Sequence, residues 1–255
     1  MIALRYHWQV TLALISALTP PLAVTLTERG PEGLKPIAAA LAVSLFWDLI
    51  FTRVRHQPPS WHSLPTALIV TIMVTPDLPL WQLALALSFG LVIGEQVFGG
   101  RGFGFLNAAA VTLAFLIFAF PGTTLPVPSP TLGYATLPGL ALLLAVGLAF
   151  WRVVVALALG LSVGFFMNAG TLPGVELALT AIFAATFLVA DPAASAATQF
   201  GRWLYGFAAG LLAALFIPFG MVEALVFAAL LAGLVAPLID DIVIRAQIGR
   251  RSARG

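Results

Sequence analysis

Apolar residues recur along the chain in runs of about twenty, separated by short polar or proline-containing breaks. Runs of this length match the roughly 30 Å hydrocarbon core of a bilayer. The pattern therefore predicts an all-α polytopic membrane protein with about ten transmembrane helices. The predicted helices cover residues 9–27, 33–52, 64–75, 79–97, 104–120, 137–150, 153–167, 177–190, 202–217 and 221–238.

Two of the predicted helices end beside a paired acid and proline. The third is only about twelve residues long and stops at Thr75-Pro76-Asp77, and the eighth stops at Ala190-Asp191-Pro192. A helix of about twelve residues is too short to span the hydrocarbon core. The sequence thus predicts short, interrupted helices at both places.

The run from Leu137 to Asn168 is interrupted only by Trp151-Arg152. A single helix over this run would be about 48 Å long, which exceeds the thickness of the hydrocarbon core. Two short helices are therefore favoured over one long helix.

The basic residues fall unequally on the two faces that ten crossings create. One face receives Arg5, Arg53, Arg55, Arg101, Arg152, Arg202, Arg245, Arg250, Arg251 and Arg254. The other face receives only Arg29 and Lys35. Because cytoplasmic loops carry the excess of lysine and arginine, both termini are predicted to be cytoplasmic. A nine-helix arrangement would place the C-terminal arginines outside, so we reject it.

The two halves of the chain match at an offset of 116 residues. This offset carries Pro76 onto Pro192, Phe103-Gly104 onto Phe219-Gly220, and Asn107-Ala108 onto Glu223-Ala224. Five helices per half is an odd number, so the second copy enters the membrane from the opposite side, as in inverted-repeat transporters. Chance similarity between two apolar segments is the alternative. The predicted division is a first five-helix repeat (1–121), an external loop (122–136), a second five-helix repeat (137–243) and a basic cytoplasmic tail (244–255).

The amino-acid composition excludes several kinds of functional site. The chain is 61% hydrophobic and 9% charged and has no cysteine, which excludes disulfides, thiolate metal ligands and cysteine catalysis. The three histidines are scattered, so we predict no metal site. The basic residues lie between apolar runs and match topology rather than nucleic-acid binding. The first apolar run contains Pro20-Pro21 and lacks a small-residue cleavage site, so we expect a retained helix rather than a signal peptide.

A glycine-rich stretch, FGGRGFGFLN, interrupts the apolar pattern after the fourth predicted helix and includes Gly99, Gly100 and Gly102. A dinucleotide-binding loop would need a preceding β-strand, and the pattern predicts none. The stretch is then either a tight turn or backbone that lines a buried ligand. Asn107 is predicted to lie about one turn inside the fifth helix, where an amide is costly unless it has a partner.

Two acidic residues are predicted to lie within the membrane. An ionisable residue inside a helix bundle is a candidate functional group, which makes Asp48 and Glu223 candidates for an ion pathway. Asp48 lies about one turn from Arg53, so a simple ion pair is the alternative. Asp77 and Asp191 lie at helix ends, where turn formation is an equally good interpretation.

Four segments resemble a known family in order along the chain. They are 94–102 with Asn107 and 114–116; 190–192 with Thr198, Gly201 and 205–206; Glu223 with 236–240; and 63–68 with 75–76 and 79–81. Together they resemble the NqrB/RnfD family, which comprises membrane components of the Na⁺-translocating NADH:quinone reductase (NqrB) and of the Rnf electron-transport complex (RnfD). The resemblance extends from about residue 10 to residue 243.

The resemblance implies ten helices in two inverted halves, and it implies flavin cofactors. One would be an FMN joined by a phosphoester to the threonine of an S-G-A-T motif on the external side, and another a non-covalent flavin near the glycine signature. On the family pattern, the cofactor-binding residues are Gly99, Gly100, Gly102, Asn107, Asp191 and Thr198, with Thr136 as the candidate for covalent FMN.

The sequence departs from the family pattern at several of these positions. Glu95 stands for a lysine and Ala108 for a proline, and no S-G-A-T motif is present. Its nearest counterpart is Gly133-Tyr134-Ala135-Thr136, in the predicted external loop. Thr136 could equally be the N-cap of the sixth helix. We therefore favour non-covalent riboflavin or FMN over flavin attached to Thr136.

These observations predict a flavin-binding subunit of an Rnf-like or Nqr-like electron-transport complex in the bacterial inner membrane, with ion translocation as a possible coupled process. Its expected partners are other membrane and peripheral subunits and membrane lipid, and no nucleic acid. The competing interpretation is a small-solute channel or secondary transporter, because five-plus-five inverted repeats with broken helices also serve that role.

Overall fold

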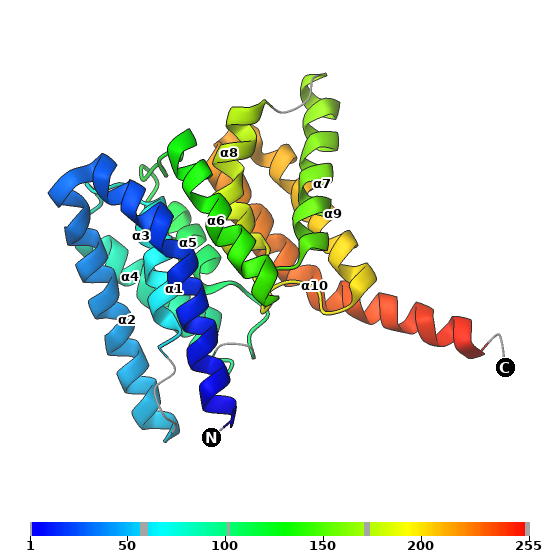
Figure 1. Ribbon diagram of the computed structural model, residues 1–255, viewed down its shortest axis with the longest axis horizontal. Coiled ribbons are helices and arrows are strands. Elements are labelled where there is room, and N and C mark those ends of the chain that lie inside the picture. The colour runs from blue at the N-terminus through cyan, green and yellow to red at the C-terminus, as the bar shows by residue number, and fades with distance from the viewer. Residues whose placement is uncertain (1, 57–60, 101–102, 171–173, 253–255) are drawn as a thin grey trace.

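The computed structural model describes residues 2–56, 61–100, 103–170 and 174–252, which are helical with short connecting loops (Figure 1). Within these ranges no β-strand forms. The ten α-helices are α1 (Ile2–Arg29), α2 (Leu34–Arg55), α3 (Ser63–Met73), α4 (Leu80–Leu91), α5 (Ala108–Ala119), α6 (Pro130–Val146), α7 (Trp151–Ala169), α8 (Val175–Ala184), α9 (Gln199–Phe216) and α10 (Met221–Ser252).

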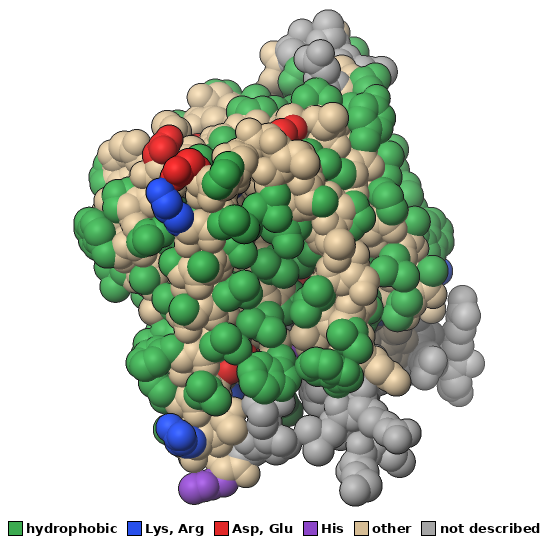
Figure 2. All heavy atoms as spheres, turned by 60° about the vertical axis from the view of Figure 1, so that its left-hand side comes forward, with side chains coloured by type: hydrophobic (Ala, Val, Ile, Leu, Met, Phe, Trp, Pro, Cys, Tyr) green, Lys and Arg blue, Asp and Glu red, His purple; other side chains and the backbone are tan. Residues whose placement is uncertain are grey.

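The outer surface is that of a membrane protein. Figure 2 shows charged side chains gathered toward two opposite ends of one face, with a largely hydrophobic band between them. Four segments are long and apolar enough to cross a bilayer: Trp8–Arg55, Trp151–Asn168, Gln199–Phe219 and Met221–Ile248. The first contains both α1 and α2. Shorter apolar helices occupy Ser63–Met73, Leu80–Gln96, Ala108–Ala119, Pro130–Val146 and Leu177–Val189.

Each of the ten predicted helices has a counterpart in the structure, and the run over 137–168 forms two helices, as favoured. Several boundaries were predicted wrongly. α1 begins at Ile2 rather than at 9, and α6 ends at Val146 rather than at 150. α5 begins at Ala108 rather than at 104, and α10 continues to Ser252 rather than ending at 238. α6 begins at Pro130 rather than at 137, because Ser129 accepts a hydrogen bond from the Leu132 amide at 3.2 Å and caps the first turn.

The helix contacts repeat between the two halves. α2 packs on α4 as α7 packs on α9, and α1 packs on α3 as α6 packs on α8. The pairs α1·α6 and α5·α10 join one half to the other. In Figure 1, α1 rises from the lower edge while α6 descends toward it. This pairing and antiparallel course are those of two five-helix inverted repeats.

Glycines allow the closest helix contacts. A Cβ added at Gly210 of α9 would lie 2.3 Å from the Leu157 carbonyl oxygen of α7, and one added at Gly160 of α7 would lie 2.2 Å from the Phe207 carbonyl oxygen. These distances leave no room for a side chain. Small residues four apart, such as Gly206 and Gly210, are typical of helix pairs that approach closely in membranes.

Candidate functional site

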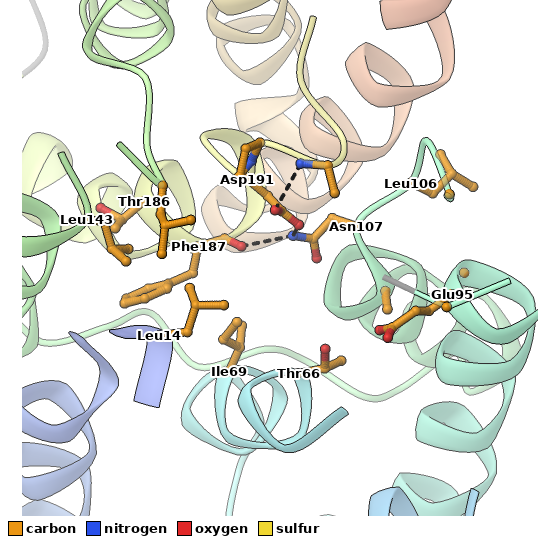
Figure 3. A pocket seen from close by; sticks show the side chains of 17 residues that line it. Leu14, Thr66, Ile69, Glu95, Leu106, Asn107, Leu143, Thr186, Phe187 and Asp191 are labelled. Carbon is orange, nitrogen blue, oxygen red and sulfur yellow. Dashed lines mark hydrogen bonds between the residues drawn. The ribbon is translucent and has the colours of Figure 1, made fainter. Parts of the chain in front are cut away.

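A small, partly open cavity lies where the two halves meet, beside two turns of π-helix. One turn, η2 (Val92–Gln96), follows α4, and the other, η3 (Ala185–Val189), follows α8. Single π-helical turns occur frequently at functional sites. The cavity holds about 40 Å³. Its polar lining side chains are Thr66, Glu95, Asn107, Thr186 and Asp191 (Figure 3).

Asn107 joins the two halves at this cavity. Its side-chain amide donates to the Phe187 carbonyl oxygen at 2.9 Å and to Asp191 Oδ2 at 2.9 Å. Its Oδ1 accepts from the Ala110 amide at 3.1 Å, so Asn107 is the N-cap of α5. The prediction that placed it one turn inside the helix was wrong. Both amide hydrogens are engaged, and the group is 7% exposed.

Asp191 lies opposite Asn107, in the loop that follows η3. Its Oδ1 accepts from the Ala193 amide at 3.2 Å, and its Oδ2 accepts from Asn107. Asp191 therefore stabilises a turn at the helix end, as one of its two interpretations predicted. It also lines the cavity.

The described residues of the glycine-rich stretch lie beside the cavity, between η2 and α5. Gly99 and Gly100 have φ angles of 113° and 98°, a region that other residues rarely adopt. Gly100 lines the cavity, whereas Gly102 lies outside the described residues. Gly94 approaches α5 so closely that an added Cβ would lie 3.1 Å from the Ala108 Cα. Gly94 therefore allows η2 to pack against the start of α5, whereas Gly99 and Gly100 allow the backbone to turn after η2.

Three lining residues were not predicted as site residues: Glu95, Thr66 and Thr186. Figure 3 shows the Glu95 carboxylate and the Thr66 hydroxyl pointing toward the centre of the cavity. Thr186 donates to the Ile182 carbonyl oxygen at 2.6 Å. In the sequence, Glu95 stands out only as a departure from the family pattern. The two threonines lie on short helices, where apolar periodicity alone gives no signal.

Asp48 belongs to a separate buried network and lies outside the cavity. Its carboxylate accepts from the Ser63 hydroxyl at 2.5 Å and from Gln96 Nε2 at 3.2 Å. Arg55 donates to Gln96 Oε1 at 2.9 Å and to the Gln96 carbonyl oxygen. Arg53 is exposed, so its suggested pairing with Asp48 was wrong. The network joins α2 and α3 to η2, which carries Glu95.

Thr198 also lies outside the cavity. Its hydroxyl caps α9 by accepting from the Gly201 amide at 3.1 Å, and it donates to Asp240 Oδ1 at 2.6 Å. Asp240 accepts as well from the amides of Ala197 and Thr198 at 2.6 and 2.9 Å. Thr198 therefore fastens the loop after Asp191 to α10.

Glu223 lies at the opposite end of the contact between the halves. Its Oε1 accepts from the Leu125 amide at 3.3 Å, which ties the segment between the halves to the first turn of α10. A carboxylate in that turn is also stabilised by the helix dipole. Glu223 and Asp48 do not share the cavity, so the structure does not bring the two predicted pathway residues together.

Thr136 is not in a loop. It lies within α6, its side chain is fully buried, and its hydroxyl donates to the Leu132 carbonyl oxygen at 2.8 Å. The predictions of an external loop extending to residue 136 and of an N-cap at Thr136 were wrong, because Ser129 caps α6 two turns earlier.

The cavity fits flavin in chemistry but not in volume. Carboxylate and hydroxyl groups are suitable partners for the polar edge of an isoalloxazine ring. The volume of about 40 Å³, however, is room for only a few water molecules, since about 10–15 Å³ of such space is enough to hold one. The space admits water or a small ion, and a tricyclic ring enters only if the lining residues move apart.

A family model described as the NQR2, RnfD, RnfE family matches residues 5–128 and 127–249. A protein from Pseudomonas aeruginosa, named as the B subunit of the Na(+)-translocating NADH-quinone reductase, is 30% identical over 270 residues. That alignment covers 82% of this chain and 66% of the relative. The chain thus spans about two thirds of the length of this relative.

Two relatives with the same name extend the comparison. The protein from Azotobacter vinelandii is 30% identical over 85% of this chain and 68% of its own length. The protein from Yersinia pestis is 29% identical over 100% of this chain and 77% of its own length. With the family model covering nearly all residues, these matches confirm the resemblance, and the chain belongs to the NQR2, RnfD, RnfE family.

Proposed function

We propose that this chain is a membrane subunit of an electron-transport complex of the Na⁺-translocating NADH:quinone reductase or Rnf type. The observation that carries the proposal is the family match over nearly the whole chain, combined with an all-helical apolar fold. Its partners would be the other subunits of such a complex. The test is identification, by mass spectrometry, of the proteins that co-purify with the chain from its own membranes; isolation alone under mild detergent would count against the proposal.

We further propose that a non-covalent flavin, riboflavin or FMN, binds at the cavity beside Asn107. Support comes from the polar lining, the two π-helical turns and the glycine-rich loop, whose outer residues are exposed. Because the cavity is smaller than the ring, binding requires the loop around Gly99 and Gly100 to move outward. Such a flavin would supply the electron-transfer chemistry.

The chain's own residues would hold and orient the ring. The Thr66 hydroxyl points into the cavity and makes no hydrogen bond to another described residue, so it is available to a ligand. Asn107 and Asp191 instead hold the two halves together, and this fixes one wall of the site. The protein would thus supply burial, orientation and hydrogen bonding, while the redox chemistry belongs to the cofactor.

Thr66→Val tests this site without breaking a bond inside the protein. Loss of one hydrogen bond to the ring should weaken flavin retention about two- to tenfold. The flavin absorbance band of the purified protein, divided by protein content, gives the stoichiometry. Thr71→Val is the matched control, because Thr71 lies on the same helix and bonds to the Leu68 carbonyl oxygen outside the cavity.

A wild-type protein that carries no flavin in mild detergent, together with its co-purifying subunits, would refute the flavin proposal. Equal flavin loss in the Thr66 and Thr71 variants would place the flavin elsewhere. Neither result would contradict membership of an electron-transport complex, which the co-purification experiment tests.

We infer that both termini face the cytoplasm. Ten of the twelve basic residues fall on that predicted face, and α1 begins and α10 ends on the same lower side of Figure 1. Single cysteines at Ser252 and Thr123 test the orientation, because the chain has no native thiol. A membrane-impermeant reagent applied to intact cells should label Thr123→Cys and not Ser252→Cys; the reverse pattern would invert the topology.

Passage of a small ion or solute is the second candidate function. The observation that favours it is the cavity itself, which is water-sized and lined by two acidic residues between interrupted helices. Flavin-free protein that releases a trapped ion from proteoliposomes would support this function. Flavin-containing protein without such flux would support the redox proposal.

A further inference from the structure

Two arginines and several aromatic rings gather where α7 and α9 begin. The Arg152 guanidinium lies 4.9 Å from the centroid of the Trp151 ring, and that of Arg202 lies 3.4 Å from the Phe150 ring. The rings of Trp151 and Trp203 pack edge to face at 5.7 Å. Tryptophans at this level are typical of a membrane–water interface.

The positive charge of this cluster is only partly compensated. Arg152 and Arg202 repel each other, while Asp240 attracts Arg202. The Asp240 carboxylate is already occupied by three hydrogen bonds from Ala197 and Thr198, and it forms no ion pair with either arginine in the described part of the chain. Arg202 donates through Nε to the Ala196 carbonyl oxygen at 3.3 Å, and no described residue is hydrogen-bonded to Arg152.

An exposed apolar stripe leads away from the arginines along α7. Trp151, Val155, Leu159 and Val163 recur every four residues and are 52%, 41%, 52% and 43% exposed. The stripe is about 18 Å long at 1.5 Å per residue. On the neighbouring α9, Phe200, Leu204 and Phe207 are exposed as well. The backbone of Phe207 lies against Gly160 of α7, so α9 adds apolar surface beside α7. The surface thus combines a group of arginines and aromatic rings at one end with an apolar stripe that is longer than half of the roughly 30 Å hydrocarbon core.

We propose that the beginnings of α7 and α9 form a site for an anionic phospholipid, with Arg152 and Arg202 binding the headgroup phosphate. Arginine guanidinium groups suit phosphate because they present several donors in a planar fork. Basic pockets between membrane helices are known to bind anionic headgroups, and the acyl chains would lie along the α7 stripe. A free phosphate ion would use the arginines but gain nothing from the stripe.

Native mass spectrometry of the full chain tests the site, after addition of phosphatidylglycerol or of phosphatidylcholine with the same acyl chains. The wild-type protein should retain phosphatidylglycerol preferentially. Arg152→Gln should weaken this retention about fivefold, and the double variant with Arg202→Gln about 25-fold. Because Arg202 also bonds within the chain, Arg152→Gln is the cleaner variant. Arg53→Gln, an exposed arginine at the end of α2, is the matched control and should retain the lipid.

Equal retention of the two lipids by the wild-type protein would overturn the proposal, as would an equal loss in the Arg53 control. Displacement of the lipid by millimolar inorganic phosphate would identify a free-phosphate site and overturn the lipid assignment. Preserved retention in the folded double variant, judged by its helical circular dichroism and monodisperse elution, would show that these arginines are not the headgroup site.

Discussion

The two ends of the contact between the halves are built on equivalent positions with different side chains. We call them the Asn107 end and the Glu223 end, since the 116-residue offset relates these two residues. At the Asn107 end, Asn107 donates to the carbonyl oxygen of Phe187. The equivalent carbonyl at the other end belongs to Thr71, and it accepts from Arg29 at 2.8 Å. Because Glu223 has no hydrogen to donate as a carboxylate, the repeat recruits a different residue there.

Within the part of the chain that the structure describes, the π-helical turns lie at the Asn107 end. η2 and η3 end the helical segments that converge on it, whereas the equivalent residues, 208–212 of α9 and 69–73 of α3, are regular α-helix. The two repeats therefore have the same helix arrangement at both ends, and the helices deviate from regular α-helical geometry at the Asn107 end. Because single π-helical turns are frequent at functional sites, this departure supports the proposed site at the Asn107 end.

A third difference concerns the loops after the short helices. In the second half, Asp240 fastens the loop at Thr198 to α10. The equivalent positions in the first half, Gln82 and Thr124, instead line an open groove of about 520 Å³. The groove exists because α5 ends at Ala119, while α10 continues past Asp240. The loop at Thr198 is therefore hydrogen-bonded to α10, whereas the equivalent loop at Gln82 borders an open groove.

The largest expected difference in stability between the two halves comes from replacing equivalent glycines by alanine. At Gly210 a Cβ meets the Leu157 carbonyl oxygen at 2.3 Å, so Gly210→Ala should cost about 3 kcal/mol of unfolding free energy or prevent folding. At the equivalent Gly94 the nearest atom is the Ala108 Cα at 3.1 Å, and the same change should cost about 1 kcal/mol. Thermal unfolding in detergent measures both.

Gly174→Ala is the control for this pair, because no atom lies within 4 Å of the added Cβ and its backbone angles suit alanine. Because Gly174 is the N-cap of α8, where glycine is preferred over alanine, the change should cost no more than about 1 kcal/mol. A Gly94 variant as damaged as the Gly210 variant would show that η2 and α5 are packed as tightly at Gly94 as α9 and α7 are at Gly210.

Substitution of Asn107, which bonds to the Phe187 carbonyl, and of Arg29, which bonds to the equivalent Thr71 carbonyl, should each destabilise only its own end of the contact between the halves. Asn107→Ala removes a cap and two donated hydrogen bonds, with an expected cost of about 2–3 kcal/mol. Arg29→Met removes two bonds, to the carbonyl oxygens of Thr71 and Ile72, with an expected cost of about 1–2 kcal/mol. Hydrogen exchange should rise in residues 185–191 for the first variant and in residues 69–74 for the second. If hydrogen exchange rose at both ends in either variant, the two sets of hydrogen bonds would not be independent of each other.

Loss of the Asp240 attachment should loosen only the second-half loop. Asp240→Ala removes three hydrogen bonds to a carboxylate and should cost about 1.5 kcal/mol while making residues 190–198 more susceptible to protease. Gln82→Ala, at a groove-lining position of the first half, should change stability by less than about 0.5 kcal/mol. Equal protease sensitivity of the two variants would remove this difference between the halves.

The sequence was sufficient to predict the fold because apolar length and charge asymmetry are properties of the chain itself. Ten helices, the interruptions after the third and eighth, and the split at Trp151 all follow from these patterns. The boundary errors arose where local chemistry competes with periodicity. Ser129-Pro130 is a cap signal within a proline-rich segment, and the apolar pattern alone places the start of α6 too late.

The candidate site was predictable only in part. Gly100, Asn107 and Asp191 were identified from motifs, and they do converge on one cavity. Thr66 and Thr186 were not, because the packing of short helices from different halves brings them together. The bonds from Asn107 to Phe187 and Asp191 leave no pattern in one sequence, since their partners lie 80 and 84 residues away. The π-helical turns have no signal in the apolar periodicity either.

No effect on flavin content is expected from Thr136, which the misplaced start of α6 had made a candidate for covalent FMN. Its buried hydroxyl already bonds to Leu132, so a flavin transferase could reach it only if α6 unwound. Thr136→Val should therefore leave flavin content unchanged and cost no more than about 1 kcal/mol of stability. In-gel fluorescence of the wild-type chain after denaturation in SDS should be absent, because a non-covalent flavin separates from the unfolded chain. A Thr136 peptide heavier by one FMN phosphoester would contradict this expectation, and it would mean that the flavin is attached before α6 folds.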